Sequence, residues 1–100
     1  PGSVLELKNF SQGLRLPHMG WNSIQNISNS ILFRNIVDPQ FYFLHSYFFN
    51  PEKNSFTISE TKYGINFSSA INYKNIFATQ FHPEKSHKWG MELLRNFASI

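Results

Sequence analysis

The sequence contains no cysteine and no long apolar run. Because none of its 100 residues is a cysteine, a disulfide scaffold, a cysteine-ligated zinc site and a cysteine nucleophile supplied by this chain are excluded. The longest apolar run, Phe41–Leu44, ends at His45, far short of the roughly 18 residues that a membrane-spanning helix needs. No secretory leader precedes it, so we expect a cytoplasmic protein that does not cross a membrane.

Charged residues are also scarce. They make up 15% of the sequence and give a net charge of +3, whereas about 25% is typical of soluble domains. The nine lysines and arginines are scattered singly, and this pattern does not predict nucleic-acid binding. The four histidines have no carboxylate at a diagnostic spacing, so no metal site is predicted.

Aromatic residues are abundant instead, at 17% of the sequence, and eleven of them are phenylalanines. This composition predicts one small folded domain over residues 1–100, with apolar surface that a partner or further chain covers. The sequence opens with Pro1 and Gly2 rather than with methionine, and we expect the true N-terminus to lie elsewhere.

The hydrophobic pattern predicts an α/β domain of mostly antiparallel strands, closed by a C-terminal helix. Strands are expected at 4–7, 14–16, 40–49, 55–63, 65–73 and 75–81. Between them we expect a turn at 11–13, a loop at 19–22, a poor helix within 23–37 and a hairpin-length turn at 50–54. Strand 40–49 is expected to be covered on both faces. The final helix, 86–100, should carry an apolar stripe of Met91, Leu94, Phe97 and Ala98.

The clearest chemical motif is His82-Pro83-Glu84, at the end of a predicted strand. Residues two apart on an extended segment point to the same side, so Glu84 can reach back to the imidazole of His82. A carboxylate on one ring nitrogen fixes the tautomer and leaves the other nitrogen free as a base. The alternative is a surface histidine followed by a glutamate near the start of the next helix. Ser86 is expected to cap that helix by accepting a hydrogen bond from an early amide.

Two further segments carry candidate binding residues. In His45-Ser46-Tyr47 the backbone amides at a strand end could hold a carboxylate, or the polar side chains could simply face water. The segment 17–22 collects residue types that are enriched at interfaces, or it packs on its own core.

Together these segments resemble a known family. Pro17-His-Met-Gly-Trp-Asn22, Tyr42-Phe-Leu-His-Ser-Tyr47 and Gln80-Phe-His-Pro-Glu-Lys-Ser86 occur in this order. They resemble the C-terminal half of the glutamine amidotransferase subunits of imidazole glycerol phosphate synthases, within class I. The resemblance implies the C-terminal portion of a flavodoxin-like α/β fold and an enzyme that needs no cofactor.

The resemblance also implies a mechanism and a partner. A Cys-His-Glu triad would hydrolyse glutamine to glutamate and ammonia, with His82 moving protons and Glu84 orienting His82. The backbone of Ser46 and Tyr47 would hold the amino-acid end of the glutamine substrate. Ammonia would pass to a (β/α)₈ barrel, the cyclase subunit of a heterodimer in histidine biosynthesis. Four residues match positions that face this cyclase: Met19, Trp21, Tyr42 and Lys85.

The departure from the family is that an N-terminal half with the nucleophilic cysteine is absent, so the chain alone is predicted to be inactive. Two alternatives stay open at this point. A paralogous amidotransferase would feed ammonia to another acceptor, such as a surface-glycan sugar. A non-catalytic module would use its aromatic surface to dock a partner.

Overall fold

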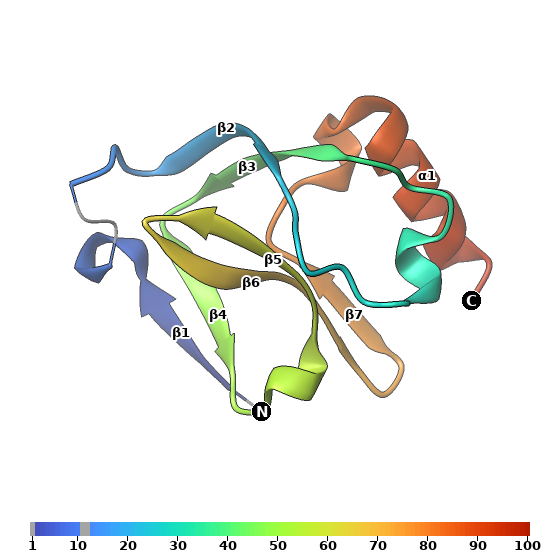
Figure 1. The fold of residues 1–100 in the computed structure, drawn as a ribbon, viewed down its shortest axis with the longest axis horizontal. Coiled ribbons are helices and arrows are strands. Elements are labelled where there is room, and N and C mark those ends of the chain that lie inside the picture. Colours follow the sequence, from blue (N-terminus) through green and yellow to red (C-terminus); the bar gives the residue numbers. More distant parts are fainter. Residues whose placement is uncertain (1, 11–12) are drawn as a thin grey trace.

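The computed structural model describes residues 2–10 and 13–100 and contains three small antiparallel sheets with one C-terminal helix (Figure 1). The first pairs β1 (Gly2–Glu6) with β4 (Tyr47–Pro51), and the second pairs β2 (His18–Ser23) with β3 (Gln40–His45). The third contains β5 (Thr57–Tyr63), β6 (Ile65–Tyr73) and β7 (Ile76–Thr79). Helix α1 spans His87–Ala98, and short 3₁₀ turns lie at Leu7–Asn9, Ile31–Phe33, Asn54–Phe56 and Pro83–Lys85.

Two isolated β-bridges connect the second sheet to the third. One lies after β2 and the other at β3, so the two sheets are joined on both sides. Gln25, just after β2, exchanges backbone hydrogen bonds of 2.7 and 2.8 Å with Glu60 of β5. On the other side the amide of His82, which follows β7, donates to the Tyr42 carbonyl of β3 at 2.8 Å. The segment after β7 therefore returns to β3, and this return positions His82.

Phenylalanines fill the space that these strands enclose. Phe41 and Phe43 are fully buried on one face of β3, and the ring of Phe41 stacks on Phe81 with centroids 4.0 Å apart. The ring of Phe67 in β6 packs edge-on against the ring of Phe43, with centroids 6.2 Å apart. Offset and edge-on aromatic pairs of this kind add stability beyond the apolar area that they bury, so the segment that leads from β7 to His82 rests on a tightly packed core.

The second half of the chain follows the predicted pattern. The strands expected at 55–63, 65–73 and 75–81 are present as β5, β6 and β7, and the strand expected at 4–7 is present as β1. Gly64 separates β5 from β6 with a φ of 81°, in the left-handed region that glycine adopts at no steric cost. The predicted mixture of antiparallel strands and a closing helix is confirmed.

The first half differs from the prediction at several points. No strand forms at 14–16, and residues 11 and 12 of the expected turn lie outside the described residues. The predicted loop at 19–22 is instead β2, because its backbone pairs with the aromatic strand β3 along its whole length. The segment 23–37 forms one 3₁₀ turn rather than a helix, since Asn26 and Asn35 adopt positive φ angles that interrupt helical geometry.

The aromatic stretch 40–49 forms two strands rather than one. It breaks at Ser46 into β3 and β4, which join different sheets. Only one face of β3 is buried, because its side chains alternate between the core and the surface and Leu44 is exposed. The segment 50–54 is not a hairpin turn either, because β4 pairs with β1 and β5 pairs with β6.

Helix α1 packs through a different face from the predicted stripe. Met91, Leu94 and Phe97 are exposed, whereas Gly90, Leu93 and Asn96 are buried. The side-chain amide of Asn96 donates to the carbonyls at positions 32 and 34, at 2.9 and 2.7 Å, and ties the helix to the Ile31–Phe33 turn beside it (Figure 1). In the part of the chain that the structure describes, no helix has the length and apolarity to cross a bilayer.

Candidate active site

His82 and Glu84 form a hydrogen-bonded pair at the end of the segment that follows β7. Nδ1 of His82 lies 2.9 Å from Oε2 of Glu84. The side chains are 36% and 58% exposed, so the pair lies at the surface rather than inside the core. Pro83 begins a 3₁₀ turn that curls the chain so that the glutamate side chain meets the imidazole.

The charge of Glu84 fixes the tautomer of His82. A hydrogen bond from its own backbone amide, followed by the hydrogen bond to His82, holds the pKa of Glu84 below its usual value. An ionised carboxylate only accepts hydrogen bonds, so Nδ1 of His82 carries the proton. Nε2 of the neutral imidazole is then left as the basic nitrogen, free for a group that approaches from outside the pair.

Ser86 holds the backbone of this turn, which differs from its predicted role as a helix cap. Its hydroxyl accepts from the Tyr42 amide at 3.0 Å and donates to the His82 carbonyl at 2.6 Å. It makes no hydrogen bond to an early amide of α1. Because the hydroxyl is fully buried between two backbone groups, it clamps β3 to His82.

Gly90 lets α1 approach the same turn closely. A Cβ on Gly90 would lie 2.7 Å from the carbonyl carbon of Pro83 and 3.1 Å from Cβ of Ser86, and closer still to the Pro83 carbonyl oxygen. Real Cβ atoms do not approach backbone this closely, so only glycine permits this helix position. The peptide between His82 and Glu84 is thus fixed from the side of the helix as well.

The predicted substrate-binding residues lie at the break between β3 and β4. Ser46 and Tyr47 are exposed there, and each has its carbonyl engaged. The Ser46 carbonyl accepts from the amide of Leu7 at 2.9 Å, and the Tyr47 carbonyl accepts from Nδ1 of His45 at 2.9 Å. Burial lowers the pKa of His45, the hydrogen bond to the Tyr47 carbonyl raises it, and His82 lowers it. The break lies at the end of β3, the strand whose Tyr42 carbonyl accepts from the His82 amide.

The four predicted partner-facing residues gather on one surface. Met19 and Trp21 alternate outward on β2, and Tyr42 lies opposite Trp21 on β3 with ring centroids 6.0 Å apart. Nζ of Lys85 lies 5.9 Å from the centre of the Tyr42 ring. Met19, Trp21, Tyr42 and Lys85 are called the aromatic surface below.

Two residues that the sequence did not single out belong to the same region. His87 stacks on Trp21 with centroids 5.4 Å apart and planes 9° apart. Leu44 is exposed directly opposite Met19 in the β2–β3 register. The alternation of β3 could have identified Leu44 once its pairing with β2 was known. No sequence signal identifies His87, because the stacking depends on where α1 begins.

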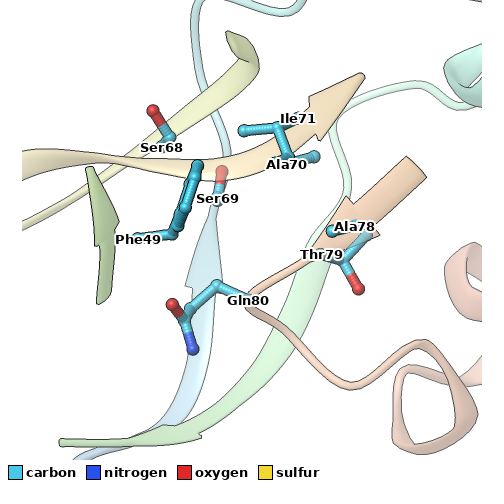
Figure 2. A pocket seen from close by; sticks show the side chains of 8 residues that line it. All are labelled: Phe49, Ser68, Ser69, Ala70, Ile71, Ala78, Thr79 and Gln80. Atoms are coloured by element: carbon cyan, nitrogen blue, oxygen red, sulfur yellow. The ribbon is translucent and has the colours of Figure 1, made fainter. Parts of the chain in front are cut away.

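A second feature is an apolar pocket of about 280 Å³ between β4, β6 and β7. Figure 2 shows Phe49 on one side of it, the β6 residues Ser68 to Ile71 above, and Gln80 below. Gln80 immediately precedes Phe81 and His82, so the pocket opens beside the segment that carries the candidate base. Across the described ranges, no cluster of three histidine or carboxylate side chains could hold a metal ion.

Comparisons with known proteins agree with the motifs. A sequence model of the glutamine amidotransferase class-I family matches residues 7–100. Relatives named imidazole glycerol phosphate synthase subunit HisH include one from Bdellovibrio bacteriovorus, 44% identical over 103 residues, which covers all of this chain and 50% of the relative. Another, from Leptospira interrogans, is 49% identical over 96 residues, which covers 92% of this chain and 47% of the relative. The chain spans about half the length of the curated relatives that it matches.

A solved structure shares the fold. The crystal structure of a Thermoplasma acidophilum protein assigned to GMP synthase superposes with a TM-score of 0.74 at 20% identity. The match covers 98% of this chain and 47% of that chain. The arrangement of strands and helix described above therefore recurs within a chain about twice as long.

Proposed function

Because this chain belongs to the class I glutamine amidotransferase family, we propose that it forms the His-Glu half of a glutaminase. The full domain would hydrolyse glutamine to glutamate and ammonia within imidazole glycerol phosphate synthase, the name that its relatives carry. The single observation that supports this most directly is the 2.9 Å contact between Nδ1 of His82 and Oε2 of Glu84, which lie at the surface in the segment after β7. A purely non-catalytic module has no need of a base oriented in this way.

In the first half-reaction a cysteine thiol from the other half of the domain attacks the side-chain amide carbon of glutamine. Nε2 of His82 takes the thiol proton, and the carbon–sulfur bond forms. His82 then returns that proton to the amide nitrogen as the carbon–nitrogen bond breaks, so ammonia leaves and a thioester remains.

In the second half-reaction His82 removes a proton from water, which attacks the thioester carbon. The carbon–sulfur bond breaks, glutamate is released, and the proton returns from His82 to the thiolate. Each half-reaction places a positive charge on the imidazole between the step in which His82 takes a proton and the step in which it returns that proton. Glu84, ionised and hydrogen-bonded at Nδ1, stabilises that charge and keeps Nε2 aimed outward.

We assign the amino-acid end of glutamine to the backbone at Ser46 and Tyr47. Two observations support this position: both residues are exposed beside the strand break at Ser46, and this break ends β3, the strand that pairs with His82 through the Tyr42 carbonyl. Both carbonyls already accept hydrogen bonds within this chain. These bonds hold the backbone in one orientation, in which a ligand would meet it. The amino-acid end would thus be held while the side-chain amide extends toward His82.

The missing half of the domain would cover the apolar surface that this chain leaves open. The pocket in Figure 2 is lined by Phe49, Ala70, Ile71 and Ala78 together with polar neighbours. The outer face of α1 exposes three large apolar side chains: Met91, Leu94 and Phe97. Surfaces of this kind rarely stay uncovered in a soluble protein. Without that half there is no cysteine, and the chain alone would be inactive.

The aromatic surface would form the heterodimer contact with the cyclase. Aromatic residues and methionine are enriched in such interfaces. Lys85 follows directly after Glu84, so a cyclase carboxylate that paired with it would lie beside the catalytic pair. Ammonia released at His82 would pass to the cyclase, which would use it to close the imidazole ring. The complex would act in histidine biosynthesis in the cytoplasm. The relatives' names give no support to a different acceptor.

The test joins residues 1–100 to the N-terminal half of the Leptospira interrogans relative and measures ammonia release from glutamine with that organism's cyclase present. His82→Ala should lower kcat at least about 100-fold, because general acid–base groups contribute that much or more. The control is Arg95→Ala, which removes an exposed side chain that pairs with Glu92 on the surface of α1 and that the mechanism does not use. Full activity of His82→Ala would refute the role assigned to His82.

A further inference from the structure

Two buried histidines form a directly hydrogen-bonded pair that the proposed reaction does not use. His18 of β2 and His45 of β3 are register partners and are 3% and 9% exposed. Nδ1 of His18 lies 2.8 Å from Nε2 of His45. One ring must donate and the other must accept, so this contact exists only while the accepting nitrogen is unprotonated.

The partners at either end fix which nitrogen carries each proton. The Tyr47 carbonyl can only accept, so Nδ1 of His45, 2.9 Å away, donates to it and Nε2 of His45 is an acceptor. Nδ1 of His18 therefore donates to His45. Nε2 of His18 in turn accepts from the Asn22 amide at 3.2 Å, and that amide also donates to the Lys62 carbonyl at 3.2 Å. We call Asn22, His18, His45 and the Tyr47 carbonyl the histidine relay.

The surroundings keep both rings neutral. His18 lies between Tyr63 and Phe43, stacked on both with centroid distances of 4.1 and 4.7 Å. Burial, and then the neighbouring His45, lower the pKa of His18 to about 4. Burial and the charge on His82 also lower the pKa of His45, while the bond to the Tyr47 carbonyl acts in the opposite direction. Neutral rings are the state that the order of donors requires.

The relay ends at Tyr47, the first residue of β4, directly after the break at Ser46. β4 belongs to a two-stranded sheet with β1, and the two carbonyls at this end of the strand are held from two different directions. The amide of Leu7 holds the Ser46 carbonyl from the side of β1, and the His45 ring holds the next carbonyl from the core. Phenylalanine would fill the space of His45 equally well, but it would leave the Tyr47 carbonyl without this donor.

Building on the proposed function, we propose that the histidine relay positions the glutamine-binding backbone. By donating to the Tyr47 carbonyl, His45 holds the peptide groups of Ser46 and Tyr47 in the orientation that receives the amino-acid end of glutamine. His18 and Asn22 keep His45 in the required tautomer. His18 and His45 are positioning residues, because neither touches the reacting atoms.

The kinetic test uses the joined full-length protein with its cyclase. His45→Phe should raise the KM for glutamine about tenfold and change kcat less than about threefold, as expected when binding rather than chemistry is weakened. His45→Asn keeps a donor near the Nδ1 position and should restore the KM to within about threefold. The matched control is Ser59→Ala, which removes a buried 2.8 Å hydrogen bond to Ser69 in the same core and should leave the KM unchanged.

A spectroscopic test needs no substitution. The imidazole ¹⁵N resonances of the unsubstituted protein should show His18 and His45 each protonated at Nδ1 and unprotonated at Nε2. A proton on Nε2 of His45 would overturn the proposal even if His45→Phe failed to fold. An unchanged KM in His45→Phe, or a His45→Asn variant no better than His45→Phe, would overturn it as well.

These outcomes separate the relay from the function on which it rests. If the joined protein hydrolyses glutamine and loses this activity in His82→Ala, an unaltered KM in His45→Phe refutes the relay alone. If the joined protein releases no ammonia at all, the proposed function fails, and the relay loses its role with it.

Discussion

The substitution Gly90→Ala separates local helix propensity from packing at the candidate site. In the interior of a helix, alanine is more favourable than glycine by about 1 kcal/mol, so propensity alone predicts a more stable protein. The structure predicts the opposite. The added methyl would lie 2.7 Å from the Pro83 carbonyl carbon, inside the contact limit, and the turn or the helix must move apart.

The size of the effect follows from these two terms. Overpacking a tightly fitted site costs about 1–3 kcal/mol, and the upper part of that range applies because the obstacle is backbone rather than a flexible side chain. After the gain in helix propensity, we expect a net loss of about 1–2 kcal/mol in the free energy of unfolding. The displaced turn carries Glu84, and a shift of about 1 Å at a reacting group can lower the rate about 100-fold.

Urea denaturation and glutamine hydrolysis of the joined protein measure the two effects. Arg95→Ala serves as the control on the same helix, because Arg95 is exposed and makes only a surface pair with Glu92. It should change stability by less than about 0.5 kcal/mol and leave kcat unchanged. A Gly90→Ala variant that is more stable than the parent and fully active would refute the close approach of α1 to the 83–85 turn.

Two further predictions concern buried polar groups. Ser86→Ala leaves the Tyr42 amide without its acceptor, and should cost about 1–3 kcal/mol in urea denaturation and lower kcat; an unchanged kcat would show that the clamp does not position His82. Because the pKa of folded His18 is about 4 and that of an unfolded histidine about 6.5, the unfolded state binds more protons between these values. The free energy of unfolding should therefore fall as the pH is lowered from about 6.5 toward 4, by up to about 3 kcal/mol, and level off below. His18→Phe should flatten this slope, and an equally steep slope in the variant would contradict the assignment.

The sequence predicted best where local pattern and tertiary structure agree. Strands β5 and β6 alternate apolar and polar residues on either side of Gly64, and their hairpin needs no distant partner. The contact between His82 and Glu84 could also be predicted from the sequence, because the two residues are only two positions apart. In the structure Nδ1 of His82 lies 2.9 Å from Oε2 of Glu84. The assignment of these residues to catalysis stays a prediction.

The sequence predicted poorly where pairing between distant segments decides the structure. β2 contains glycine, histidine and asparagine, which do not favour strands, and it is extended because β3 lies beside it. The contact between His18 and His45 spans 27 positions and depends on the register of that pairing. In a hairpin the turn fixes the register, but β2 and β3 are joined by the long segment that contains the Ile31–Phe33 turn, so the relay could not be found from the sequence.

Helix α1 shows a different limit. Its large apolar residues suggested the buried face, but the face that packs within this chain uses a glycine, a leucine and an asparagine. Gly90 contributes by its lack of a side chain, and Asn96 by two hydrogen bonds to backbone carbonyls. Hydrophobic periodicity cannot detect either contribution. The stripe that it did detect is the surface that we assign to the missing half of the domain.

Strand β3 connects the three parts of the proposed site. The backbone of Tyr42 receives the His82 amide and donates to Ser86, while its side chain lies on the aromatic surface. Three residues further on, His45 holds the Tyr47 carbonyl. A displacement of β3 would therefore move His82, the backbone at Ser46 and Tyr47 proposed to bind glutamine, and the ring of Tyr42 together. The packed phenylalanines behind β3, Phe41 and Phe43, are fully buried and resist such a displacement, so a site that is largely exposed rests on a strand anchored in the core.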